Sequence, residues 1–126
     1  MTLKYYHCRH CSKNICLVGD DMKTPTTCCG EVMKELIPNT TDGAHEKHVP
    51  VMKFDSRVAE ITVGETFHPM THDHYIQWIA LATDRNVYTR YLDPGEVPKA
   101  YFALQPGEQP LKAFAYCNLH GLWSTN

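Results

Sequence analysis

Hydrophobic and polar residues alternate in short runs along most of this chain, with the two-residue period that is typical of β-strands. In the segment HYIQWIALAT, residues 74–83, the alternation places Ile76, Trp78 and Ala80 on one face of the expected strand. No stretch shows the period of a helix longer than a turn or two. The pattern therefore predicts an all-β chain.

A linker and a series of short strands make up most of the sequence. Residues 37–43, IPNTTDG, are rich in Pro, Asn, Thr and Gly and are interpreted as the linker. The predicted strands after it are VPVMKF, RVAEITV, HYIQWIALAT, NVYTRYL, AYFAL and LKAFAYC. Asp55 and Ser56 are expected to form the turn between the first two, and DPGEVP and QPGEQP carry strong Pro-Gly turn signals. Short strands in this number favour an antiparallel β-sandwich or a small barrel.

The first 36 residues differ from the rest, because they contain two cysteine pairs with little hydrophobic material between them. A stretch so short and so poor in apolar side chains cannot bury enough surface to fold alone, so a metal ion is expected to hold it together. We therefore predict two domains: a small metal-bound domain at residues 1–36 and a β-sandwich at residues 37–126.

Composition and charge narrow the functional classes. With 43% hydrophobic and 21% charged residues, the chain of 126 residues is expected to fold around a packed core. A net charge of −2 without a basic stripe argues against a nucleic-acid partner, and no run is long enough for a membrane span. The start, MTLKYYHCRHC, lacks the apolar segment of a secretory signal. We expect a cytoplasmic protein whose six cysteines bind metal rather than form disulfides.

A first metal site is predicted from the cysteines near the N-terminus. Cys8 and Cys11 form a CxxC pair, and Cys28 and Cys29 are adjacent. Four thiolates in one small region suit a tetrahedral zinc or iron site. The second pair has no spacer, which departs from the spacing of a zinc ribbon, and both a structural staple and an electron-transfer centre remain open. Cys16 is interpreted as a free, partly buried thiol.

A second metal site is indicated by Cys117, which lies far from the other cysteines and three residues before His120. A lone histidine in a β-protein is more often a surface residue than a ligand, but here five more histidines fall in two short clusters. These are His45 and His48, then His68, His72 and His74. A blue-copper site would place a methionine shortly after Cys-x-x-His, and no methionine follows Cys117, which weakens the copper alternative.

Three segments of the chain, EKHVPV, HPMTHDHYIQW and YCNLHGLW, resemble the superoxide reductases. The CxxC…CC unit in front of them resembles the desulforedoxin-like domain of the two-iron members of that family, the desulfoferrodoxins. The resemblance covers essentially the whole chain. It implies an immunoglobulin-like β-sandwich for the larger domain, a homodimer, and electrons supplied by a rubredoxin-like donor.

The resemblance also implies the ligands of two iron ions per chain. Four imidazoles and one axial thiolate would hold the catalytic iron, and four thiolates would hold the second, non-catalytic iron. The implied ligands are His48, His68, His74, His120 and Cys117 for the catalytic iron, and Cys8, Cys11, Cys28 and Cys29 for the second iron. No role follows for His72, and His7, His10 and His45 are interpreted as surface residues or neighbours of the ligands.

The implied activity is the one-electron reduction of superoxide to hydrogen peroxide, without production of oxygen. Iron(II) with four neutral imidazoles and one thiolate carries a net charge of about +1, which attracts the superoxide anion. The position opposite the sulfur stays open, so superoxide can bind there. The thiolate pushes electron density through the metal, which favours electron transfer. The resemblance assigns Lys47 to steering of the anion and delivery of a proton, and Glu46 to the sixth position once the iron is oxidised.

Two other functions are compatible with the residues. In the first, the chain is an iron electron-transfer protein without a catalytic role, and binding of azide or cyanide at an open position would speak against it. In the second, a zinc ribbon joined to an immunoglobulin-like domain serves as a binding module. Metal analysis with a visible spectrum separates iron from zinc, because ferric thiolate is coloured and zinc is not.

Overall fold

The structure, a computed structural model, describes residues 2–19 and 26–125, and within them it has twelve strands and one short helix. The chain divides into two compact units, residues 1–37 and 38–126, which are described separately. Residues 20–25 of the first predicted domain lie outside the described residues. No helix in the described part of the chain is long and apolar enough to cross a membrane.

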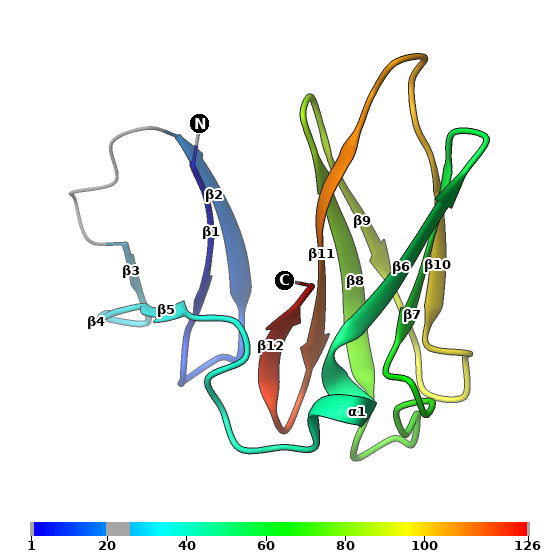
Figure 1. Cartoon of the computed structure of the whole chain (residues 1–126). Helices are drawn as coiled ribbons and strands as arrows, with labels where there is room; N and C mark the ends of the chain where they lie inside the picture. The colour runs from blue at the N-terminus through cyan, green and yellow to red at the C-terminus, as the bar shows by residue number, and fades with distance from the viewer. Residues whose placement is uncertain (1, 20–25, 126) are drawn as a thin grey trace. The chain divides into compact units, whose positions relative to one another are not determined.

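The first unit is built on a three-stranded antiparallel sheet with the strand order β2-β1-β5, and on a small hairpin of β3 with β4 (Figure 1). Its strands are β1 (Thr2–His7), β2 (Asn14–Gly19), β3 (Thr27–Cys28), β4 (Glu31–Val32) and β5 (Lys34–Leu36). Cys29 and Gly30 connect β3 to β4 with φ of 53° and 75°, the positive values that tight hairpin turns require. This turn presents Cys28 and Cys29 side by side.

Few side chains of the first unit are buried. Among its described residues, only Tyr5, Cys8 and Met33 fall in the buried class. Since small domains with so little buried apolar surface rely on disulfides or metal ions, the structure agrees with the expectation that a metal stabilises this unit.

The second unit is an antiparallel β-sandwich made of two sheets, with strand orders β10-β7-β6 and β12-β11-β8-β9 (Figure 1). A single turn of helix, α1, precedes the first strand. The elements are α1 (His45–His48), β6 (Pro50–Asp55), β7 (Val58–Val63), β8 (Ile76–Thr83), β9 (Val87–Tyr91), β10 (Lys99–Ala103), β11 (Pro110–Cys117) and β12 (Gly121–Ser124). The predicted all-β fold class is confirmed.

The turn between β6 and β7 lies one residue later than predicted. Asp55 still pairs with Val58, so it belongs to the strand, and the turn consists of Ser56 and Arg57. Both have positive φ, 50° and 67°, which is the backbone conformation of a two-residue hairpin turn. The register of the pairing, rather than the residue types, decides where this turn begins.

The strand β8 contains a bulge that the sequence pattern does not reveal. The pairing of β11 with β8 shifts by one residue just before Cys117, which pairs with Ile76, so Gln77 is the extra residue. A bulge places successive side chains out of the simple alternation. Ile76 therefore joins the buried core with Ile79, and the prediction that it shares a face with Trp78 is wrong.

Inward-facing side chains of both sheets form one hydrophobic core. It comprises Ala59, Ile61, Val63, Ile76, Ile79, Leu81, Leu92, Ala100, Phe102, Leu104, Ala113, Ala115 and Cys117. The membership of Cys117 is the point that matters for function. Because close-packed interiors hold their side chains in fixed positions, the sulfur of this residue has a defined place at the end of the sandwich.

A buried carboxylate, Glu108, closes the opposite end of the sandwich and is only 2% exposed. Four groups donate hydrogen bonds to it: the hydroxyl of Thr83, Nδ2 of Asn86 at 2.9 Å, the hydroxyl of Tyr88 at 2.7 Å and the main-chain N–H of Gln105 at 2.8 Å. Burial alone would raise the pKa of Glu108, but these hydrogen bonds outweigh it and lower the pKa to about 2. The carboxylate thus ties the β8–β9 hairpin to the segment before β11.

Replacing Glu108 by glutamine is expected to lower the midpoint of thermal unfolding by several degrees near neutral pH, because an amide turns an N–H toward donors that then lack an acceptor. The folded pKa lies below the usual 4.5, so the stabilisation is fully present above that pH and is lost as pH falls toward 2. Thermal melts should therefore show a smaller difference between parent and variant at about pH 3 than at about pH 7.

Glu60→Gln serves as the control for this comparison, because Glu60 makes a surface ion pair with Lys99 at 3.4 Å. Such pairs contribute little to stability. A difference between parent and Glu108→Gln that stays constant over this pH range would contradict the assignment of a depressed pKa.

Candidate metal centres

Five of the predicted ligands meet at one end of the sandwich. His48 is the last residue of α1, His68 follows β7, and His74 lies two residues before β8. Cys117 ends β11, and His120 lies in the turn that leads to β12. Their potential ligand atoms all lie within 4.8 Å of one another. We call these five residues the His4Cys cluster.

Hydrogen bonds to main-chain carbonyls fix two of the imidazoles. Nδ1 of His48 donates to the carbonyl of Ala44 at 2.7 Å, and Nδ1 of His68 donates to the carbonyl of Pro69 at 2.6 Å. A carbonyl oxygen can only accept, so in both rings Nδ1 carries the proton and Nε2 carries the lone pair. Each ring is thereby prepared to bind a cation through Nε2.

Two ring nitrogens of the His4Cys cluster have no hydrogen-bond partner among the described residues. Nε2 of His68 and Nε2 of His74 are buried and unpartnered in the part of the chain that the structure describes. Nε2 of His48 and Nδ1 of His120 lie 2.9 Å apart. Buried polar atoms in proteins are nearly always satisfied. A cation between the rings would accept these lone pairs together, so the donor set fits a metal ion.

Burial keeps these imidazoles neutral. It is the main cause that lowers the pKa of His48, His68 and His74, and for His68 the pKa falls to about 4. Electrostatic repulsion from neighbouring rings lowers the pKa of each further. Neutral imidazole is the form that binds metal, so little proton release opposes metal binding at neutral pH.

Cys117 supplies the sulfur of the His4Cys cluster and is fully buried. Its Sγ lies 3.8 Å from Nδ1 of His120. Burial raises the pKa of the Cys117 thiol, and the main-chain N–H groups of His120 and Leu119 partly oppose that shift. A buried thiolate needs a cation as its partner. Imidazole and thiolate ligands together suit iron, zinc or copper, so the sulfur also fits a metal site.

Trp123 and Thr41 support the His4Cys cluster, and the sequence did not predict either role. The indole ring of Trp123 stacks on His48 with the ring centroids 4.8 Å apart, and its Nε1 donates to the carbonyl of His120 at 3.0 Å. The hydroxyl of Thr41 donates to the same carbonyl. The tryptophan follows the Cys-x-x-His motif closely in the sequence, but nothing in that spacing indicates that its ring reaches His48.

Glu46 and Lys47 are exposed residues of α1 that act on the imidazoles through their charges. The positive charge of Lys47 contributes to the lowered pKa of His74, after burial and the neighbouring His120. The negative charge of Glu46 works in the opposite direction on the pKa of His48. Both predicted residues share the single helical turn that ends at His48, a member of the His4Cys cluster.

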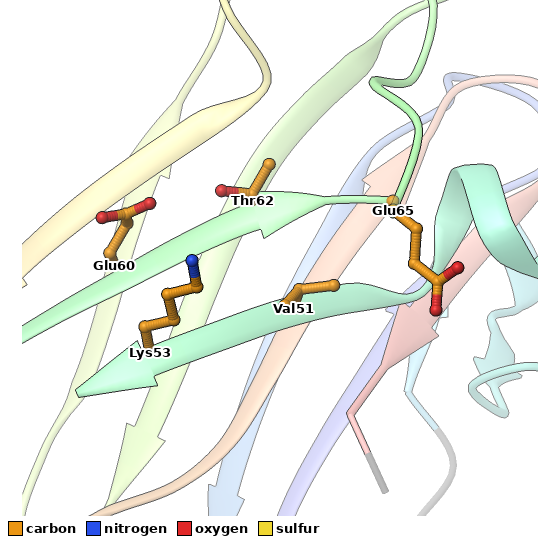
Figure 2. A pocket seen from close by; sticks show the side chains of 6 residues that line it. Val51, Lys53, Glu60, Thr62 and Glu65 are labelled. Atoms are coloured by element: carbon orange, nitrogen blue, oxygen red, sulfur yellow. The ribbon is translucent and has the colours of Figure 1, made fainter.

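Two surface hollows lie along β6. One of about 400 Å³ is lined by His45, Glu46, Val49, Val51 and Glu65. The other, of about 210 Å³, is lined by Val51, Lys53, Glu60, Thr62, Gly64 and Glu65, whose labelled side chains stand on β6 and β7 and just beyond β7 (Figure 2). Lys53 and Glu60 pair across the strands. Neither hollow concentrates positive charge, so neither is suited to hold a superoxide anion.

The residues after β7 hold α1 in place. The N–H of Gly64 donates to the carbonyl of Val49 at 3.1 Å, and the N–H of Glu65 donates to the carbonyl of Glu46 at 2.6 Å. Gly64 has φ of 84°, and a Cβ at this position would lie 2.6 Å from the carbonyl oxygen of Lys47. Only glycine allows so close an approach.

Gly64→Ala is expected to displace α1 from the His4Cys cluster, because the added methyl group would overlap the main chain of Lys47. Gly95 is the matched control, since it has φ of 89° and a Cβ there would meet no atom of the described residues within 4 Å. Both substitutions introduce backbone strain of about 1 kcal/mol. Only Gly64→Ala should release metal from the His4Cys cluster faster when a chelator is added, and equal release rates would argue against this role of Gly64.

His72 and His45 lie outside the His4Cys cluster. His72 is exposed, and its Nδ1 lies 3.3 Å from the carboxylate of Asp73. His45 packs edge-on against the Trp123 ring at a centroid distance of 5.1 Å. The structure thus brings His74, and not its neighbour His72, together with the other ligands.

The four predicted cysteines of the first unit also meet. Their sulfur atoms lie within 4.8 Å of one another, with 3.7 Å between Cys11 and Cys28 and 3.9 Å between Cys28 and Cys29. A tetrahedral site with metal–sulfur bonds of about 2.3 Å has edges of about 3.8 Å, so the spacing fits one metal ion. Main-chain N–H groups of Cys11 and His10 lower the pKa of Cys8 to about 6, which favours its thiolate.

An ion pair joins the two halves of this four-cysteine cluster. Arg9 lies inside the CxxC pair, and Glu31 lies two residues after Cys29. The guanidinium of Arg9 donates two hydrogen bonds of 2.7 and 2.6 Å to the carboxylate of Glu31, and Nε2 of His10 lies 2.6 Å from it. Hydrogen bonds from Arg9 and His10 lower the pKa of Glu31. The charges were visible in the sequence, but their pairing depends on the fold.

Cys16 is free, as predicted, but it is exposed rather than partly buried. It lies on β2 opposite Tyr5 of β1 and outside the four-cysteine cluster. Because β2 is an edge strand of its sheet, this side chain has a neighbouring strand on one side only.

The sequence and the fold are similar to those of known proteins. Residues 40–126 match the family described as Desulfoferrodoxin. The desulfoferrodoxin of Syntrophotalea carbinolica is 44% identical over 123 residues, which cover 98% of this chain and 95% of the relative. The crystal structure of the superoxide reductase from Treponema pallidum matches with a TM-score of 0.87 at 31% identity and covers 100% of both chains. Superoxide reductase (1Fe-SOR) from Giardia intestinalis, 37% identical with a TM-score of 0.57, covers 64% of this chain and 95% of its own.

Proposed function

The chain belongs to the desulfoferrodoxin family, and we propose that it reduces superoxide at the His4Cys cluster. In this reaction superoxide takes up one electron and two protons to give hydrogen peroxide: O2•− + e− + 2H+ → H2O2. No oxygen is released, in contrast to dismutation. The observation that carries the proposal is the convergence of four imidazoles and one thiol within 4.8 Å, with two buried ring nitrogens that have no hydrogen-bond partner among residues 2–19 and 26–125.

The neutral imidazoles and the buried thiol of the His4Cys cluster suit an iron ion that donates an electron. Iron bound by these five residues would supply the electron for superoxide, with the thiolate favouring its transfer. Burial keeps the imidazoles neutral, so they do not repel the ion. Cys117 is fully buried, so its thiolate charge is shielded from water and would act strongly on iron bound beside it.

Lys47 is proposed to attract superoxide and to hold a proton at Nζ for the product. Its side chain is exposed, it directly precedes His48 in α1, and its charge contributes to the lowered pKa of His74, which supports a position beside the His4Cys cluster. A cation at that place raises the rate at which an anion associates and can donate a hydrogen bond to it.

Glu46, the neighbour of Lys47 in α1, is proposed as the carboxylate that would bind iron in its oxidised form and so help release the product. Its exposed carboxylate acts on the pKa of His48, which supports its place beside the ligands. The hydrogen bond from Glu65 to its carbonyl holds the turn that carries both charged residues.

Iron also fits the four-cysteine cluster, and the chain carries two iron centres. We propose that residues 1–36 form a desulforedoxin-like iron domain and that residues 37–126 form the catalytic domain. The division of the chain into two compact units supports this assignment. So does the similarity to superoxide reductase (1Fe-SOR), which covers only 64% of this chain.

Membership of the family supports three further proposals. A rubredoxin-like protein would supply the electrons, and the chain would assemble as a homodimer. A cytoplasmic location is supported by the cysteines, all six of which are free of disulfides.

Product analysis tests the proposed reaction. With superoxide and a reductant supplied to the iron-loaded protein, we expect one hydrogen peroxide for each superoxide consumed and no oxygen. A protein that only carries electrons would leave superoxide to dismutate, and half of it would then appear as oxygen. Oxygen release at that level would contradict the proposed function and favour the electron-carrier alternative.

A further inference from the structure

Asn118, the residue after Cys117, makes contacts that the ligand set does not require. Its Oδ1 accepts a hydrogen bond from the N–H of Tyr75 at 2.9 Å, and its Nδ2 donates to the carbonyl of Asp73 at 2.9 Å. Its main-chain N–H also donates to the carbonyl of Tyr75 at 3.2 Å. Asp73 and Tyr75 flank His74, so three hydrogen bonds join the segment that carries His74 to the segment that carries Cys117.

These bonds begin where the regular pairing of β11 with β8 ends. The last paired residues are Cys117 and Ile76, just after the register has shifted at the bulge. A side-chain amide offers one carbonyl acceptor and N–H donors, like a peptide group. The side chain of Asn118 therefore continues the hydrogen-bonding pattern of an antiparallel pair beyond the ends of both strands.

We propose that Asn118 is a positioning residue of the catalytic centre, which sets the place of His74 relative to Cys117 by extending the β11–β8 pairing. The inference rests on the proposed ligand set. His48 and His68 are oriented by hydrogen bonds from their own rings to nearby carbonyls. Asn118 instead fixes His74 through the main chain on either side of it.

The hydrogen-bonded turn from Thr71 to His74 cannot do the work of the bonds from Asn118. The main chains of Thr71 and His74 exchange hydrogen bonds of 3.0 and 3.2 Å. Both residues belong to the same loop, so these bonds shape the loop without tying it to β11. The bonds from Asn118 cross between segments that lie 43 residues apart.

Cobalt(II) binding to the full chain tests the proposal without any assay of superoxide. Imidazole N–H signals shifted by cobalt in proton NMR report on the His4Cys cluster alone, because the other cluster contains no histidine. Asn118→Ala removes both side-chain hydrogen bonds. It is expected to weaken cobalt binding there by about 10-fold to 100-fold, as loss of a hydrogen-bonding partner around a metal site typically does, and to move the shifted signal of His74.

Asn39→Ala is the matched control. The side chain of Asn39 makes the same pair of contacts with the main chain of Ser124, as acceptor at 2.9 Å and as donor at 3.2 Å. Ser124 lies on β12, which carries no member of the His4Cys cluster. We expect Asn39→Ala to lower thermal stability while its cobalt affinity and shifted imidazole signals remain those of the parent.

Equal cobalt affinity and equal imidazole signals in the parent and in Asn118→Ala would overturn the proposal. If that variant does not fold, hydrogen exchange of the Tyr75 amide in the parent decides: slow exchange supports the contact, and exchange at the rate of an open loop refutes it. A parent chain with no shifted imidazole signal would instead contradict the ligand set, and with it the proposed function.

Discussion

The Lys47→Ala variant is expected to react with superoxide about 10-fold more slowly than the parent at low ionic strength, because it lacks the positive charge that attracts the anion. The rate constant of the parent should fall as salt is added, whereas that of the variant should depend on salt only weakly. Rapid-mixing or pulse-radiolysis kinetics at several salt concentrations would measure both effects. Both iron ions should be retained, because Lys47 is not a proposed ligand.

Lys112→Ala provides the control, because it removes the same charge elsewhere in the second unit. Lys112 lies on β11 five residues before Cys117, which is roughly 17 Å along an extended strand. This distance exceeds the Debye length of about 10 Å at about 0.1 M salt, so Lys112→Ala should behave like the parent at that salt concentration. A Lys47→Ala variant with the salt dependence of the parent would rule out electrostatic steering by this residue.

The Cys28→Ser variant is expected to lose the iron of the four-cysteine cluster entirely, while the His4Cys cluster keeps its iron. A serine hydroxyl is not ionised at neutral pH and cannot replace a thiolate in an S4 site. The reaction with superoxide should then change by less than about two-fold, because the reacting iron lies in a separate compact unit. Metal analysis and the visible spectrum would show one iron per chain instead of two.

Cys16→Ser is the matched control for the loss of a thiol from the same unit. Cys16 is exposed and lies outside the four-cysteine cluster, so this variant should retain both iron ions. A Cys28→Ser chain that kept its His4Cys iron and yet lost all activity would show that the division of labour between the two centres is wrong.

Most of the fold could be predicted, because strands and turns are encoded by local patterns. The alternation of residues in β7 and the Pro-Gly segments on either side of β10 act within a few neighbouring residues. The two errors, at the turn of Ser56 and Arg57 and at the bulge of Gln77, both concern register. Register is decided by the partner strand, which the local pattern does not contain.

The candidate sites also contain some features that are encoded locally and others that depend on distant parts of the chain. The Cys8–Cys11 and Cys28–Cys29 pairs are local, and the resemblance to a family assigned the remaining ligands. No local pattern indicated the residues that hold the ligands in place. Each of these residues contacts a partner that is distant in the sequence. Trp123 stacks on His48, Glu31 pairs with Arg9, and Asn118 bonds to the main chain of Tyr75.

Side-chain chemistry and short-range backbone preferences need no partner, so the available ligand atoms and the local turns that present them could be read from the amino-acid order alone. The resemblance had already named His74 as a ligand, but the position of its ring relative to the sulfur of Cys117 was set only when the chain folded. This placement depends on a bulge and on hydrogen bonds between segments 43 residues apart, and both exist only once the strands have paired.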